Sequence, residues 1–169
     1  MLIKKLSDEI FKKNISDTEL KLKVTKEINK YFSRVETPLS MIEKNSIVED
    51  LVNDVVGYGP ITDFLKDREI TEIMVNNPFK IYIEKFGKLY PTNKTFLDEA
   101  HLFRIIDKIV SRVGRRIDES IPYVDARLPD GSRVNVIIHP LAINGPMMTI
   151  RKFSAEPFTI DDLIEFGTT

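Results

Sequence analysis

The spacing of apolar residues changes at Ile70, and this change constrains the fold more than any other feature of the sequence. Before it, apolar residues recur every three or four positions, which is typical of amphipathic helices. After it, short strand-like segments lie between turn sequences. Because short turns favour antiparallel pairing, the sequence predicts an α+β fold, in which an N-terminal helical bundle precedes an antiparallel sheet packed with helices.

The first predicted helix begins at a capping box and spans about 20 residues. Ser16 would accept a hydrogen bond from an early N–H of the helix, and Glu19 would reach back to the cap. The apolar face that follows comprises Leu20, Val24, Ile28, Phe32 and Val35.

The next helix is expected to begin at Thr37-Pro38, because proline is tolerated in a first turn. Ser46 and Glu49 repeat the capping-box spacing, and Gly57 with Gly59-Pro60 is expected to end the helix. The lysines of both helices are interpreted as the solvated face of a small bundle. A nucleic-acid footprint is the alternative, but the interleaved acidic residues would repel a phosphate backbone.

Six later segments have the pattern of strands. One hairpin turns at Phe86-Gly87, and another turns at 129–132, where Pro129 fixes one dihedral angle and Gly131 supplies a positive one. The segments are 70–75, 81–84, 89–90, 123–128, 133–138 and 147–153. Asp98 is expected to cap a helix that ends at Gly114, and a short helix is expected from Thr159 to Gly167.

Arginine is concentrated in one region of the chain. Of the nine arginines, seven lie within residues 101–152, from Arg104 to Arg151, whereas only two of the sixteen lysines, Lys108 and Lys152, lie there. A guanidinium offers a planar fork of donors that matches phosphate or carboxylate. The net charge of the whole chain is -1, but residues 101–152 carry nine basic and five acidic groups. The region is therefore predicted to bind an anion, with salt bridging and solubility as the alternative.

The turn and strand patterns predict where three of these arginines lie. Arg127 and Arg133 flank one tight turn, so their side chains are expected to converge on one sheet edge. Strand alternation places Arg151 on one face with Thr149 and Phe153.

The acidic residues Asp118, Glu119 and Asp125 lie among these arginines. They are interpreted as ion-pair partners that orient the guanidinium groups, with acid-base catalysis as the alternative. Arg104 and Arg112 are predicted to be exposed helical residues.

No catalytic or metal site is predicted within this chain. Its seven glycines fit neither phosphate-binding glycine motif, and it has no cysteine. The two histidines, His101 and His139, are interpreted as structural or surface residues. The charged N-terminus is not a signal peptide, and no apolar run approaches the roughly 20 residues that span a bilayer.

Five blocks together resemble the N-terminal region of the type II/IV secretion and pilus-assembly ATPases, most closely the CpaF/TadA-like branch related to VirB11. The blocks are GYGPITDFLKDREITEIMVNNP (57–78), IYIEKFGKL (81–89), GRRIDESIPYVDARLPDGSRVNVI (114–137), GPMMTIRKF (145–153) and TIDDLIEFG (159–167). Residues before 57 resemble the helical extension of the same branch.

The resemblance implies a domain division. In this family an α+β domain, often described as PAS-like, precedes a RecA-like ATPase domain that carries the P-loop. By this resemblance residues 1–56 are the helical extension, residues 57–158 the α+β domain, and residues 159–169 the start of a linker helix. The chain ends where the RecA-like domain would begin, so we expect an N-terminal part that is not active alone.

The resemblance also implies a nucleotide site. Family members form hexamers, bind ATP between the two domains, and use arginines of the first domain to contact its phosphates. By position the counterparts here are Arg127, Arg133 and Arg151, and Arg116 is a weaker candidate. ATP and Mg²⁺ are expected in the full-length protein, with Mg²⁺ held by the ATPase domain and no cofactor bound tightly to this chain.

The expected partners are the protein's own ATPase domain, neighbouring subunits of the hexamer and inner-membrane platform proteins, but no nucleic acid. The expected location is cytoplasmic, peripherally associated with the inner face of the cell membrane. The alternative function is a stand-alone nucleotide- or protein-binding adaptor module without ATPase activity.

Overall fold

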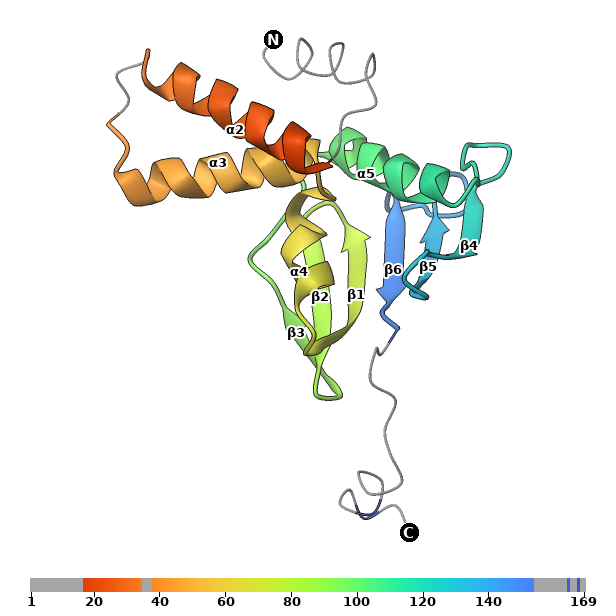
Figure 1. The fold of residues 1–169 in the computed structure, drawn as a ribbon. Helices are drawn as coiled ribbons and strands as arrows, with labels where there is room; N and C mark the ends of the chain where they lie inside the picture. The colour runs from red at the N-terminus through yellow and green to blue at the C-terminus, as the bar shows by residue number, and fades with distance from the viewer. Residues whose placement is uncertain (1–16, 35–37, 154–163, 165–166, 168–169) are drawn as a thin grey trace.

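The computed structural model describes residues 17–34, 38–153, 164 and 167, and it has the predicted α+β fold (Figure 1). Within these residues, one antiparallel sheet has the strand order β3-β2-β1-β6-β5-β4. The strands are β1 (Ile70–Asn77), β2 (Lys80–Lys85), β3 (Lys88–Pro91), β4 (Tyr123–Arg127), β5 (Arg133–Ile137) and β6 (Met147–Arg151). All six lie where the sequence pattern predicts strands.

One face of the sheet carries the hydrophobic core. Ile73 of β1 lies opposite Ile150 of β6, which lies opposite Val134 of β5, and all three side chains are fully buried. Helices α4 (Thr62–Lys66) and α5 (Glu99–Arg112) pack on this face through residues such as Phe64 and Ile106. Burying each large apolar side chain stabilises the fold by about 1.5–3 kcal/mol.

Helix α5 has the predicted ends. The Asp98 side chain accepts a hydrogen bond from the His101 N–H at 2.6 Å, and Gly114 has a φ of +68° just beyond the helix. The 3-10 turn η1 (Gly59–Ile61) and α4 were not predicted, because they are too short to show helical spacing.

Two helices precede this domain and pack on each other (Figure 1). Helix α2 (Asp17–Phe32) and helix α3 (Met41–Val55) share a small core around Val24, Ile28 and Val52. Helix α2 is 16 residues long, shorter than predicted. Ser16, Val35 and Thr37 lie outside the described residues, so the predicted first capping box is not described.

The predicted cap of the second helix was wrong. Ser46 lies inside α3. The residue that caps the helix is Ser40, and Glu43, three residues later, completes the capping box. The Ser40 N–H donates to Glu43 Oε2 at 2.8 Å, and the Glu43 N–H donates to Ser40 Oγ at 3.3 Å. Ser40 and Glu43 have the same spacing as Ser46 and Glu49, so spacing alone did not identify which pair is the cap.

Two side chains of α5 contact the segment at and just after the end of α3. Lys108 Nζ donates to the carbonyl groups of Val55, Val56 and Gly57 at 2.7–3.1 Å, at the C-terminus of α3. Arg112 donates to the Tyr58 hydroxyl at 2.6 Å and lies over the same ring. The short helix predicted at 159–167 lies outside the described residues except for Ile164 and Gly167.

Candidate functional site

Three arginines form a row across adjacent strands. Arg127 of β4 lies opposite Arg133 of β5, and Arg133 lies opposite Arg151 of β6. Directly opposite residues point to the same face and have Cβ atoms about 4.5–5.5 Å apart. We call these three residues the arginine row. It lies on the face opposite the core, and all three residues are exposed.

A row of three like charges is unfavourable for the sheet itself. Like charges directly opposite one another destabilise a strand pair, and nothing in the backbone pattern requires arginine at all three positions. The row therefore concentrates guanidinium donors on one part of the sheet, where they suit an anionic group.

The turn between β4 and β5 fixes one end of this row. Gly131 has a φ of +88°, and a Cβ atom at this position would lie 3.0 Å from Cγ of Phe153. The Phe153 N–H donates to Oγ of the buried Ser132 at 3.2 Å. The turn and the residues just after Arg151 are thus packed together, at the end of the sheet where the chain leaves β6 (Figure 1).

Asp125 holds the central arginine of the row. Arg133 donates from Nε to Asp125 Oδ1 at 2.9 Å and from Nη2 to Oδ2 at 2.5 Å. The hydrogen bonds from Arg133 keep the pKa of Asp125 below its usual value. The expected ion pairing of Asp125 with an arginine is confirmed by this contact.

The two outer arginines differ from the central one. Within the part of the chain that the structure describes, neither Arg127 nor Arg151 makes an ion pair or a side-chain hydrogen bond. Glu72 of β1 lies opposite Arg151 in the ladder without forming an ion pair there. In the row, the central guanidinium is held by Asp125, and the two outer guanidinium groups have no side-chain partner among the residues that the structure describes.

The two lysines of the arginine-rich region serve the fold instead. Lys108 binds the end of α3, and Lys152 Nζ donates to the carbonyl of Phe64 at 3.3 Å and to that of Asp67, at the end of α4. Burial lowers the pKa of Lys152. Both lysine side chains are thus directed at carbonyl groups at helix C-termini, where a cation is favourable.

Arg116 is not part of the row. It pairs with Asp118 at 2.7 Å in the loop before β4, as expected for an acidic neighbour. Arg127 is the last residue of β4, whereas Arg116 lies in the loop before the first residue of that strand, which is about 13 Å long. Arg112 binds Tyr58, and Arg104 is exposed on α5.

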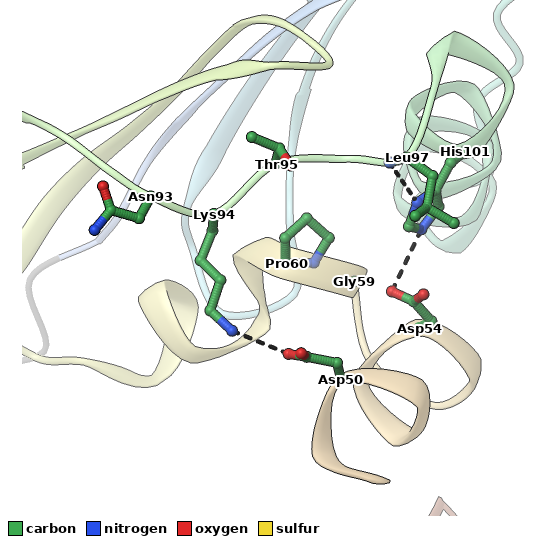
Figure 2. A pocket seen from close by; sticks show the side chains of 9 residues that line it. All are labelled: Asp50, Asp54, Gly59, Pro60, Asn93, Lys94, Thr95, Leu97 and His101. Atoms are coloured by element: carbon green, nitrogen blue, oxygen red, sulfur yellow. Dashed lines mark hydrogen bonds and ion pairs between the residues drawn. The ribbon is translucent and has the colours of Figure 1, made fainter. Parts of the chain in front are cut away.

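A separate cavity of about 260 Å³ lies between α3, the segment before α5 and the first turn of α5 (Figure 2). Lys94 pairs with Asp50 at 2.9 Å, and this hydrogen bond raises the pKa of Lys94. His101 is buried, accepts from the Leu97 N–H through Nδ1, and lies 3.4 Å from Asp54 through Nε2. These contacts connect α3 to α5 and to the segment before it. Because the charged groups of the cavity already pair with one another, the cavity is a weaker candidate for binding an anion than the arginine row.

Neither a metal site nor a membrane span is found in the described part of the chain. No group of three or more His, Asp or Glu side chains there could hold a metal ion. None of the helices described is long and apolar enough to cross a bilayer.

Comparison with known proteins gives a consistent match. Residues 54–169 match the family described as Type II/IV secretion system protein. An uncharacterized protein of Methanocaldococcus jannaschii is 42% identical over 106 residues, which are 62% of this chain and 15% of that protein. The type IV secretion system protein VirB11 of Bartonella henselae is 32% identical over 109 residues, which are 64% of this chain and 31% of that protein.

A solved structure agrees with these sequence matches. The crystal structure of the VirB11 ATPase from the Brucella suis type IV secretion system, in complex with sulphate, has a TM-score of 0.57 and 29% identity. The match covers 64% of this chain and 34% of that one. This chain thus spans only 15% to 34% of these three relatives. The fold and the sequence match lead to the same conclusion: the chain belongs to the type II/IV secretion system protein family.

Proposed function

We propose that this chain is the N-terminal region of a motor ATPase that drives secretion or pilus assembly, and that its arginine row contacts the phosphates of ATP. The observation that carries the proposal is the register that puts Arg127, Arg133 and Arg151 side by side on three strands. Guanidinium groups stabilise negative charge on a phosphoryl group as it is transferred. The sulphate in the Brucella suis VirB11 structure is a tetrahedral anion of the same shape as phosphate.

The site would be shared between two domains. The arginine row supplies only cations, so Mg²⁺ and the phosphate-binding loop would come from a RecA-like domain that follows this one. Residues 1–56 would be the helical extension, 57–158 the α+β domain and 159–169 the start of the linker. Because the row lies where the chain leaves β6, closure of the two domains would bring the arginines to the nucleotide, and hydrolysis would depend on that closure.

The wider assembly follows from the same proposal. The full-length protein would form a hexameric ring in the cytoplasm, at the inner face of the cell membrane, and act on platform proteins of the secretion or pilus machinery. VirB11 relatives are named as components of type IV secretion systems, which supports this assignment.

Arginine footprinting of the full-length protein tests the contact. We expect bound ATP to protect Arg127, Arg133 and Arg151 from modification by phenylglyoxal, as measured by mass spectrometry. Arg116 and the exposed Arg104 serve as internal controls, because neither lies in the row, and their modification is expected to be unchanged. Equal modification of the three row residues with and without ATP would contradict the proposal.

A further inference from the structure

The contact between Asp125 and Arg133 leaves a defined part of the guanidinium unused. A guanidinium has five N–H donors. Asp125 takes the Nε donor and one Nη2 donor, both on one edge of the fork. Three donors remain, and two of them, one on Nη1 and one on Nη2, point in parallel along the other edge. That edge is the arrangement that grips two oxygens of one phosphate.

Asp125 reaches this position because of the strand register. It is two residues before Arg127 on β4 and lies opposite Asn135, so it is the diagonal neighbour of Arg133 on the same face. Diagonal neighbours are within reach of a long side chain. The Arg133 side chain is 68% exposed, so without Asp125 little else would restrict its rotamers.

We propose that Asp125 is a positioning residue that fixes the Arg133 fork with its Nη1–Nη2 edge directed at a phosphate group, between Arg127 and Arg151. This inference rests on the proposed function of the arginine row. Asp125 does not touch the anion. It acts by ordering Arg133 before binding, so the entropy of that side chain is not lost at the moment of contact.

This role and simple electrostatics predict opposite results for Asp125→Asn. Asparagine removes one negative charge close to the site, which by charge alone strengthens anion binding. Loss of the ordered fork weakens it, by up to about tenfold for one immobilised arginine. The sign of the change therefore separates positioning from charge.

Asp130→Asn is a matched control. Asp130 lies in the turn beside Arg133 and accepts from the Ser132 N–H at 3.0 Å, a hydrogen bond that asparagine retains. Among the described residues, the Asp130 side chain makes no ion pair with an arginine. The variant thus removes the same charge nearby and leaves the Arg133 contact in place.

The test titrates this chain with inorganic tripolyphosphate at low ionic strength and follows the arginine Nε–H and backbone signals by NMR. We expect Asp125→Asn to bind more weakly than both the native chain and Asp130→Asn, and to lose the distinct Nε–H signal of Arg133. Binding by Asp125→Asn as tight as that of Asp130→Asn, or tighter, would overturn the positioning role alone. Failure of the native chain to bind, or equal binding by Arg133→Ala, would instead overturn the arginine row as an anion site and the role of Asp125 with it.

Discussion

Lys108 is the single side chain that most directly joins the helical pair to the sheet domain. Its ammonium lies within hydrogen-bond distance of three consecutive carbonyl groups at the end of α3. These carbonyl groups have no partner inside the helix, and a cation is favourable beside them. Lys108 therefore contributes to the attachment of α2 and α3, together with the contacts of Lys94 with Asp50 and of His101 with Asp54.

We expect Lys108→Met to destabilise the helical pair by about 1–3 kcal/mol, because it leaves these carbonyl groups without their charged donor. Hydrogen exchange of the α2 and α3 amides should become faster, while exchange in the sheet stays as it is. Lys26→Met on the exposed side of α2 is the control, since the structure gives Lys26 no partner among the described residues. Unchanged hydrogen exchange in Lys108→Met would show that the contact of Lys108 does not stabilise α2 and α3.

At the residue scale, arginine and lysine have different roles within residues 101–152. The sequence predicted that the arginines of residues 101–152 bind an anion and offered no account of the two lysines. In the structure, both lysines cap helix C-termini, whereas the row consists of arginines alone. The sequence could not show this division, because the carbonyl groups concerned come from residues 51 to 88 positions away.

Among the elements, the β2–β3 hairpin carries local strain. Phe86 is the only non-glycine residue in the described chain with a positive φ, +52°, and its side chain is 72% exposed. A bulky residue in this region costs about 1 kcal/mol, whereas asparagine tolerates it. Its neighbour Lys85, which also pairs with Glu69, lies 5.6 Å from the ring and recovers little of this cost.

We expect Phe86→Asn to raise the free energy of unfolding by about 0.5–1 kcal/mol, because Asn followed by Gly87 suits a tight hairpin turn. Denaturant unfolding measures the change. Phe79→Asn is the control: Phe79 is also an exposed aromatic residue at a turn of β2, at 64%, but its φ is not positive. If both substitutions changed the free energy of unfolding equally, loss of an exposed aromatic side chain, not relief of backbone strain, would explain the effect of Phe86→Asn.

Most helices and strands could be predicted from the sequence, but the pairing of distant strands could not. Strand alternation and turn residues predicted all six strands, and Asp98 with Gly114 predicted both ends of α5. Local pattern did not predict that β1 pairs with β6, since Ile73 and Ile150 meet only through tertiary packing. It also did not predict which of two equivalent capping boxes begins α3.

The arginine row shows the same limit for the site. The sequence predicted that Arg127 and Arg133 flank one turn, and the resemblance to the family added Arg151 and Arg116. The register of β5 with β6 is what makes Arg133 and Arg151 neighbours, and a slip of one residue would send Arg151 to the other face. Strand pairing in the structure shows that these three residues form one row and that Arg116 is not part of it.

At the scale of the whole molecule, the proposed function assigns this chain one side of a site shared between two domains. It has a packed sheet with an attached helical pair (Figure 1). The arginine row lies on β4, β5 and β6 of this sheet. The row would act on a nucleotide that a following domain holds. The central claim is therefore that these arginines contribute to hydrolysis by the full-length protein.

The most direct test is the rate of ATP hydrolysis by the full-length protein with Arg127, Arg133 and Arg151 each changed to alanine. We expect kcat to fall about 100-fold or more in at least the central variant, Arg133→Ala, because a lost guanidinium no longer stabilises charge on the transferred phosphoryl group. Arg116→Ala, from the same region but outside the row, should keep native turnover. Native turnover in all three row variants would contradict the account.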